Sequence, residues 1–222
     1  EDLTARKALA LEVIDRLKKE YPDAGCTLDY AHAWQLLVSV RLAAQCTDAR
    51  VNIVVEDLFA KYPSVAALAA AEPEDIEAIV KPCGLGHSKA RDISACMRML
   101  RDKYDCQVPA TFEELLALPG VGRKSANLIM GDVFGKPAIV TDTHCIRLCN
   151  RIGLVDGIKE PQKVEMALWK IIPPEEGSDL CHRFVMHGRA VCNARKPECE
   201  HCCLEAICRY AQEQFGAQTA GS

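Results

Sequence analysis

The sequence predicts an all-α fold. Apolar residues recur every three to four positions along most of the 222 residues, and no segment shows the two-residue alternation of a half-buried strand. Helix-start signals stand at several joints, and prolines and glycines separate the periodic segments. With 49% hydrophobic residues, the chain can form a core without disulfide bonds.

Short helices joined by short turns are expected from one end of the chain to the other. Thr47 and Ser64 are suitable N-caps, and Thr111 with Glu114 forms a capping box. The predicted helices lie near residues 4–20, 30–45, 47–61, 64–71, 74–81, 87–105, 112–118, 122–134, 142–152, 161–171, 179–190 and 203–214.

Composition narrows the class of protein. No apolar segment approaches the ~20 residues that a membrane helix needs, and the first residues lack the apolar core of a signal peptide. The 13 cysteines are odd in number, which indicates reduced thiols in a reducing compartment. We expect no membrane partner, and a location in the bacterial cytoplasm with the nucleoid, or in the nucleus of a eukaryote.

Charge is unevenly distributed along this chain of net charge −4. Residues 81–103 carry six basic and two acidic side chains, residues 118–151 five and two, and residues 181–197 four and none. Each run alone is typical of a solvated helix face. Three such runs on an acidic chain indicate that a polyanionic partner is worth considering.

Residues 118–124, Leu-Pro-Gly-Val-Gly-Arg-Lys, predict a tight turn that leads directly into a helix. Exposed N–H groups in such a turn, together with a helix N-terminus, can bind a phosphate. Lys124 follows the turn, where the helix dipole disfavours its charged form, and Asp142 is a candidate acid/base partner. From these residues alone, a phosphate-contacting or merely exposed Lys124 and an N-cap Asp142 are the interpretations that rank first.

Four cysteines near the C-terminus predict a metal site. Their order is Cys-x6-Cys-x2-Cys-x5-Cys, formed by Cys192, Cys199, Cys202 and Cys208. Zinc sites usually contain two close pairs of ligands, whereas one close pair with isolated flanking cysteines suits an iron–sulfur cluster with one cysteine per iron. A zinc site remains the alternative interpretation of these four cysteines. We interpret Cys203 as a bystander and His201 as an unnecessary ligand.

From about Ala8 to Phe215, the chain resembles endonuclease III, the helix-hairpin-helix family of DNA glycosylases and AP lyases. The resemblance rests on the cysteine spacing and on residues 44–48, 84–90, 118–126, 140–144 and 187–189. It implies a six-helix barrel domain with the helix-hairpin-helix over residues 26–136. Residues 1–25 and 137–222 would then form an iron–sulfur cluster domain.

The resemblance also implies an activity and a cofactor. The family excises oxidised pyrimidines such as thymine glycol from duplex DNA in base excision repair, then cleaves the abasic site by β-elimination. Lys124 would form the Schiff base, assisted by Asp142, and the four cysteines would hold a [4Fe-4S] cluster. Attack requires a neutral amine, which nearby positive charge, the helix N-terminus and partial burial would favour. The expected partner is duplex DNA with a damaged base or an abasic site, bound by a monomer.

DNA contacts follow from the same resemblance. Gln45 would fill the space of a flipped nucleotide, and Leu85 would wedge into the opposite strand. A core leucine is the alternative for Leu85, although Gly84 and Gly86 favour a turn. The other implied contacts are Asp48, Gly120, Gly122, Arg123, His144, Arg147, Arg195 and Lys196.

Three positions depart from the family pattern. Gly86 and Ala190 stand where larger or aromatic residues are usual, and Arg41 stands where an apolar residue is usual. Two rival functions remain: a monofunctional adenine glycosylase, which typically lacks a lysine at the position of Lys124, and a non-catalytic DNA-binding or structural metal protein.

Overall fold

The computed structural model describes residues 2–220, with side chains up to residue 214. Every regular element in that range is helical, which confirms the all-α prediction. None of the described helices combines the length and apolar character needed to cross a membrane. The chain divides into two compact units, Cys26–Gly135 and Glu1–Gly25 with Lys136–Ser222. Residues 1, 221 and 222, which the sequence assigned to the second domain, lie outside the described residues.

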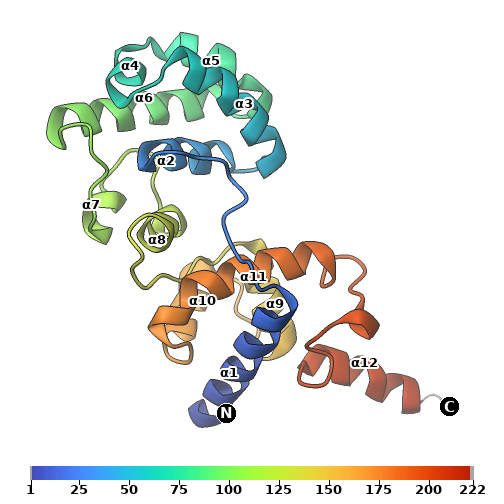
Figure 1. Cartoon of the computed structure of the whole chain (residues 1–222). Helices are drawn as coiled ribbons and strands as arrows, with labels where there is room; N and C mark the ends of the chain where they lie inside the picture. The colour runs from blue at the N-terminus through green and yellow to red at the C-terminus, as the bar shows by residue number, and fades with distance from the viewer. Residues whose placement is uncertain (1, 221–222) are drawn as a thin grey trace. The chain divides into compact units, whose positions relative to one another are not determined.

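The unit Cys26–Gly135 is built around its longest helix. Its elements are α2 (Ala33–Leu42), α3 (Asp48–Lys61), α4 (Val65–Ala70), α5 (Pro73–Val80), the 3₁₀ turn η1 (Lys81–Cys83), α6 (Gly86–Lys103), α7 (Phe112–Leu116) and α8 (Arg123–Asp132). Helix α6 packs against α2, α4 and α5, and the latter two lie along it in Figure 1. The core between these helices includes the fully buried Leu36, Leu68, Ile76, Met97 and Leu100.

Side-chain caps start the helices of this unit where the sequence predicted them. Thr47 accepts a hydrogen bond from the N–H of Arg50 at 3.3 Å, and Ser64 accepts one from Ala67 at 3.0 Å. Thr111 accepts one from the N–H of Glu114 at 3.3 Å and donates its hydroxyl to the Glu114 carboxylate at 2.7 Å. Each cap satisfies a backbone donor that has no partner within its helix.

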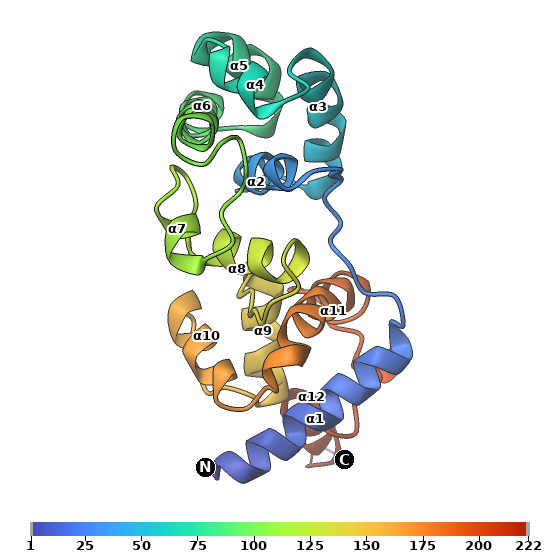
Figure 2. The same cartoon turned by 60° about the vertical axis from the view of Figure 1, so that its left-hand side comes forward.

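The other unit joins both ends of the chain. Its elements are α1 (Leu3–Glu20), α9 (Thr143–Ile152), α10 (Pro161–Trp169), η2 (Pro174–Glu176), α11 (Gly177–Ala190), η3 (Cys199–His201) and α12 (Arg209–Ala220). Helix α9 packs against α11 and α12, and α1 against α11. Arg6 of α1 and Arg209 of α12 both bind the Asp156 carboxylate. Figure 2 shows α9 beside α11.

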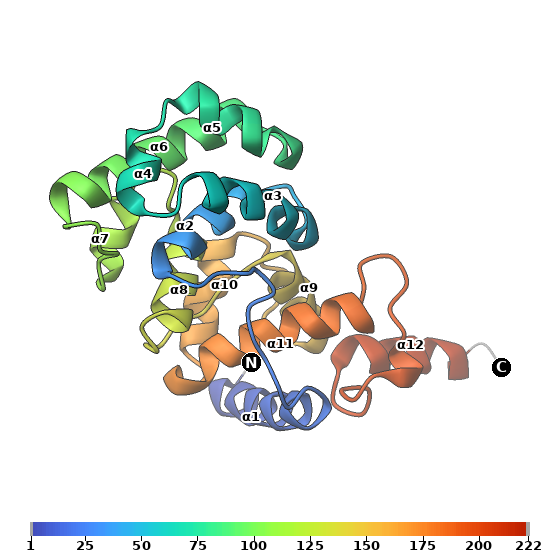
Figure 3. The same ribbon diagram turned by 45° about the horizontal axis from the view of Figure 1, so that its top comes forward.

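Two predicted helices differ from the observed ones by three or more residues at an end. The helix expected near 203–214 begins only at Arg209, because Cys199–Cys208 forms η3 and tight turns instead, with Cys202 N bonded to Cys199 O and Cys208 N to Leu204 O. Figure 3 shows this loop between α11 and α12. The helix expected over 30–45 spans only Ala33–Leu42, since Gln45 adopts a left-handed conformation with φ of 55°.

Candidate active site and metal centre

The hairpin between α7 and α8 depends on two glycines for different reasons. Backbone bonds from Leu118 N to Leu115 O at 3.1 Å and from Val121 N to Leu118 O at 3.2 Å close its turns. Gly120 has φ of +78°, and a Cβ there would lie 2.9 Å from the Cβ of Asp92. Gly122 is the extended N-cap of α8, and a Cβ there would meet nothing within 4 Å. Gly120 therefore satisfies a folding constraint, and Gly122 leaves the helix N-terminus open.

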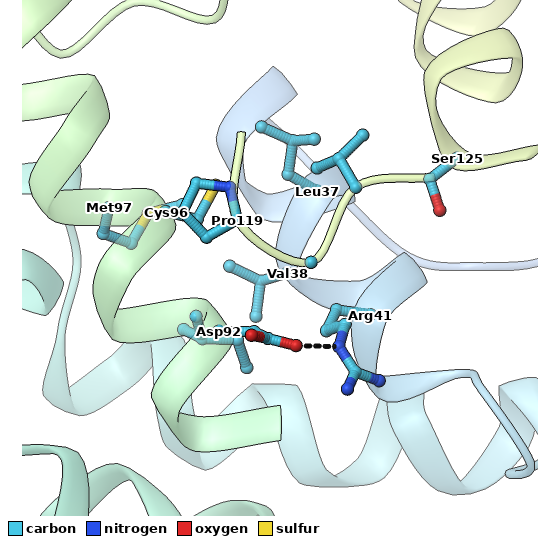
Figure 4. A pocket seen from close by; sticks show the side chains of 11 residues that line it. Leu37, Val38, Arg41, Asp92, Cys96, Met97, Pro119 and Ser125 are labelled. Atoms are coloured by element: carbon cyan, nitrogen blue, oxygen red, sulfur yellow. Dashed lines mark hydrogen bonds and ion pairs between the residues drawn. The ribbon is translucent and has the colours of Figure 1, made fainter. Parts of the chain in front are cut away.

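An ion pair lies beneath this hairpin. Arg41 Nε lies 2.8 Å from Asp92 Oδ2, and both line a small cavity with Gly120, Val121 and Ser125 (Figure 4). The cavity holds about 10 Å³, which is at most the room of one water molecule. It cannot receive a base. The departure of Arg41 from the family pattern thus has a structural explanation, because Arg41 neutralises the carboxylate on which Gly120 packs.

Lys124 is the second residue of α8 and its side chain is exposed. The partial burial expected for it is therefore wrong. The first turn of α8 holds no acidic residue, and the neighbouring Arg123 guanidinium stacks over the Phe112 ring at 4.9 Å. The amine of Lys124 is therefore on the first turn of α8, close to the helix N-terminus and to the positive charge of Arg123.

Asp142 is the N-cap of α9. The structural role that the sequence left open as an alternative is therefore confirmed. Its Oδ1 atom accepts a hydrogen bond from the N–H of Cys145 at 2.8 Å, and the side chain is half-buried. The cap fixes the direction of the carboxylate. Lys124 lies in the unit Cys26–Gly135 and Asp142 in the other unit, and the geometry of each holds within its own unit.

Gln45 and Leu85 stand on two exposed loops of the unit Cys26–Gly135. Leu85 is 55% exposed, so the alternative of a core leucine is wrong. Both residues adopt left-handed backbone conformations, with φ of 55° for Gln45 and 49° for Leu85. Gly84, before Leu85, has φ of 77°. An exposed apolar side chain on a tight turn is suited to insertion between bases.

Three further positions from the sequence interpretation lie in ordinary surroundings. Asp48 is the first residue of α3, and its carboxylate accepts a hydrogen bond from the Thr27 hydroxyl. A Cβ on Gly86 would lie 3.2 Å from the Cα of Lys81, so this chain packs the start of α6 closely on η1. Ala190 is the exposed last residue of α11.

His144 and Arg147 of α9 face Gly188 of α11. Arg147 Nη2 lies 3.0 Å from His144 Nδ1 and donates to the carbonyls of Gly188 at 3.2 Å and Cys192 at 3.0 Å. A Cβ on Gly188 would lie 2.7 Å from His144 Nδ1, so only glycine permits this approach. Arg147 therefore holds the start of the cysteine-rich loop (Cys192–Cys208) in addition to any contact with DNA.

The four predicted ligand cysteines all belong to this loop. Burial is the main reason that the pKa of Cys202 is raised to about 12, and the nearby thiols of Cys203, Cys192 and Cys208 contribute less. Burial also raises the pKa of Cys199 and Cys208, each with a smaller contribution from Cys192. Among the described residues, no three His, Cys, Asp or Glu side chains form a group able to hold a metal ion as they stand. What the structure contains here is a cysteine-rich region.

Basic and aromatic residues support the cysteine-rich loop, and the sequence interpretation missed them as site residues. Arg151 Nη1 donates to Cys192 Sγ at 3.3 Å and to Asn193 O at 2.8 Å. His187 Nε2 lies 3.1 Å from Cys202 Sγ, and its Nδ1 lies 2.7 Å from the Tyr21 hydroxyl. N–H donors directed at sulfur suit thiolate ligands. Sequence spacing could not indicate Arg151, His187 or Tyr21, because their contacts join segments that are far apart in sequence.

Arg195 and Lys196 are exposed at the tip of the cysteine-rich loop. The backbone N–H of Lys196 donates to Asn193 Oδ1 at 2.7 Å, which closes a tight turn beneath the two side chains. This turn presents two positive charges with no acidic residue between Cys181 and Pro197.

Comparison with known proteins first defines the class. Residues 38–174 match the HhH-GPD superfamily of base excision DNA repair proteins. The endonuclease III of Synechocystis sp. is 43% identical over 211 residues, which cover 95% of this chain and 96% of the relative. Two solved structures, a non-covalent endonuclease III–DNA complex and a trapped endonuclease III–DNA covalent intermediate, are each 41% identical with a TM-score of 0.89. They cover 94% of this chain and 98% of theirs. The chain belongs to the endonuclease III family, and the predicted glycosylase fold is confirmed.

Proposed function

We propose that this protein is a bifunctional DNA glycosylase and AP lyase of base excision repair. It acts on duplex DNA that carries an oxidised pyrimidine such as thymine glycol, or an abasic site, and it works as a monomer. The observation that carries the proposal is the exposed amine of Lys124, directly after a hairpin that opens a helix N-terminus. The relative trapped in a covalent intermediate with DNA supports a covalent mechanism.

Lys124 performs the first chemical step. Its Nζ lone pair attacks C1′ of a flipped nucleotide while the glycosidic bond breaks, and the electron pair leaves with the base, which takes up a proton. Opening of the sugar ring then gives a protonated imine between C1′ and Nζ. The exposure of Lys124 leaves the amine accessible to a flipped sugar.

The imine makes the second step possible. It acidifies C2′, so that a base removes a C2′ proton and the C3′–O bond breaks, with the 3′ phosphate as leaving group. Water then hydrolyses the imine and regenerates Lys124. We assign Asp142 to proton transfer in these steps and to electrostatic stabilisation of the cationic sugar. The hydrogen bond from Cys145 keeps its carboxylate oriented for that role.

The loops that carry Gln45 and Leu85 open the duplex at the damaged base, and contacts with the DNA phosphates position the duplex. Leu85 enters the stack and Gln45 hydrogen-bonds the orphaned base, which offsets the cost of unstacking. Gly120, Gly122 and Arg123 of the hairpin bind the DNA phosphates. The remaining proposed DNA contacts are Asp48, His144, Arg147, Arg195 and Lys196.

We further propose that Cys192, Cys199, Cys202 and Cys208 hold a [4Fe-4S] cluster. Residues 1–25 and 137–222 form the cluster domain, and residues 26–136 form the barrel domain. The placement of all four cysteines on one loop supports this proposal. So do the Arg151 N–H donated to Cys192 Sγ and the His187 ring nitrogen 3.1 Å from Cys202 Sγ. The four cysteines would hold the cluster and so be joined at four points of one loop, and Arg195 and Lys196, between the first two ligands, would then contact the phosphates in a fixed position. The place of action is the bacterial nucleoid.

Borohydride trapping tests the assignment of Lys124. With a duplex that carries thymine glycol or an abasic site, the unmutated protein is expected to form a stable covalent DNA adduct upon reduction. Lys124→Ala should release no base and form no adduct, while its DNA affinity changes little, because the substitution removes only the nucleophile.

Lys170→Ala is the matched control, since Lys170 is an exposed lysine of α10's C-terminal end. It should trap as efficiently as the unmutated protein. Adduct formation by Lys124→Ala would contradict the assignment. If the unmutated protein released the base without forming an adduct, it would be a monofunctional glycosylase. If the unmutated protein bound DNA but did neither, it would be a DNA-binding module.

A further inference from the structure

A lysine is completely buried in the unit Cys26–Gly135. Lys89, in the first turn of α6, has a relative exposure of 0%. Its ammonium group donates to three backbone carbonyls: Leu42 at 2.8 Å, Ala44 at 2.7 Å and Cys83 at 3.0 Å. All three protons of the amine are thereby used.

These carbonyls belong to the two loops that carry the proposed DNA-inserting residues. Leu42 ends α2, and Ala44 directly precedes Gln45. Cys83 ends η1 and stands two residues before Leu85. One side chain thus connects the Gln45 loop (residues 43–46) with the Leu85 loop (residues 83–85), although these loops are about forty residues apart in sequence.

Both loops have backbone conformations that side-chain-bearing residues rarely adopt. Gln45 has φ of 55° and Leu85 has φ of 49°, next to Gly84 with φ of 77°. Such conformations persist only where surrounding groups hold them. The amine of Lys89 bonds the carbonyl of the residue directly before Gln45 and that of the residue directly before Gly84.

The three carbonyls offset part of the cost of burying the Lys89 charge. Burial and the nearby Arg41 lower the pKa of Lys89, and the thiols of Cys46 and Cys83 act in the opposite direction. An apolar side chain in this position would avoid the cost of burying a charge. It could not donate three hydrogen bonds, nor place positive charge at the C-terminal end of α2. What distinguishes lysine at position 89 from an apolar residue is therefore its three hydrogen bonds to the backbone carbonyls.

We propose that Lys89 is a positioning residue for damage recognition, which joins the Gln45 and Leu85 loops so that both side chains enter the DNA together. This inference rests on the proposed function, in which these loops open the duplex. Lys89 lies away from solvent, so its side chain is not accessible to DNA. It acts only through the backbone of the two loops.

The test measures base unstacking apart from chemistry. A duplex with 2-aminopurine opposite an abasic site reports unstacking as a gain in fluorescence when protein saturates it. In a Lys124→Ala background, Lys89→Met should lose at least about half of that gain. With Lys124 present, single-turnover release of thymine glycol should slow about tenfold or more, because small misplacements of positioning groups have effects of that size. Cleavage of a single-stranded abasic oligonucleotide, which has no partner base to displace, should change less than about twofold.

Lys103→Met is the matched control, because Lys103 is an exposed lysine at the other end of α6. It should leave unstacking and release unchanged. In a Gln45→Ala, Leu85→Ala background, Lys89→Met should slow release no further, whereas a purely structural role would slow it again. If Lys89→Met does not fold, Lys89→Arg carries the same comparisons, since a planar guanidinium cannot reach all three carbonyls.

Equal losses on duplex and single-stranded substrates, or a normal fluorescence gain in a folded Lys89 variant, would overturn the inference. The proposed function fails separately. If the unmutated protein unstacked 2-aminopurine but released no base and formed no adduct, the enzyme assignment would be wrong, and the role of Lys89 in joining the loops would stand.

Discussion

A single carboxylate, that of Asp142, serves as a helix cap and as the proposed acid/base group. Oδ1 accepts the Cys145 N–H at 2.8 Å, which starts α9. The sequence left these two roles as alternatives, but they are compatible. A capped carboxylate has a fixed direction, and a general acid/base group requires one.

Substitution of Asp142 separates the two roles. Asp142→Asn retains an oxygen for the Cys145 N–H but loses the negative charge, so base release should fall about 100-fold or more while the melting temperature stays close to that of the unmutated protein. Asp142→Ala should lose the same activity and also about 1 kcal/mol of stability, because the cap is removed. Single-turnover rates and thermal denaturation measure the two effects. Near-normal release by Asp142→Asn would assign the proton transfer to another residue.

At the scale of elements, the α7–α8 hairpin shows that adjacent glycines meet different demands. Gly120 has positive φ and packs on Asp92, whereas Gly122 is extended and faces open space. The pattern Gly-x-Gly in the sequence does not reveal these different roles, since both glycines are typical turn residues. The neighbour Asp92, fixed by Arg41, makes the difference.

Alanine at each glycine should therefore give opposite profiles. Gly120→Ala should lower the stability of the unit by about 1–3 kcal/mol, from left-handed strain and the close approach to Asp92. Gly122→Ala should cost less than about 1 kcal/mol and weaken DNA binding instead, because a methyl group obstructs phosphate approach to the N–H groups of α8. Thermal denaturation and fluorescence anisotropy with duplex DNA measure the two quantities. A stable Gly120→Ala, or a Gly122→Ala with unchanged affinity, would contradict this account.

At the scale of the molecule, the ends of the chain belong to one unit. Helix α1 packs on α11, and Asp156 binds both Arg6 and Arg209. Salt bridges with these two arginines lower the pKa of Asp156 to about 2. The cysteine-rich loop leads into α12 within the same unit, where Arg147 and Arg151 bind its carbonyls. The conformation of this loop therefore depends on segments far apart in sequence.

Neighbouring cysteines provide a matched test of the cluster. Cys199→Ser should reduce the iron content and the visible absorbance of the purified protein, while Cys203→Ser should leave both unchanged. Loss of the cluster should release Arg195 and Lys196 from their fixed position, so that DNA affinity falls and its salt dependence decreases by the equivalent of about two phosphate contacts. Metal analysis and binding at several salt concentrations measure these effects. Zinc instead of iron in the unmutated protein would contradict the cluster, and equal behaviour of the two variants would contradict the ligand assignment.

Much of the fold and of the candidate site could be predicted because the signals are local. Apolar periodicity gave the helices, and Thr47, Ser64 and Thr111 gave caps at the positions observed. The Gly-x-Gly turn before Lys124 and the cysteine spacing are equally local. The expected burial of Lys124 and the expected start of the C-terminal helix near residue 203 were wrong, because exposure and the turns of the cysteine-rich loop depend on contacts beyond the immediate sequence.

The sequence by itself determined the helical class, the family resemblance and the identity of the candidate catalytic and ligand residues. Only the tertiary structure decided what holds them: Arg41 and Asp92 under Gly120, Arg151 and His187 at the cysteines, and Lys89 between the two insertion loops. The physical reason is the range of the interactions. Periodicity, capping and turn chemistry act over a few residues, whereas the buried amine of Lys89 reaches carbonyls 45 and 47 residues away only after the chain has folded.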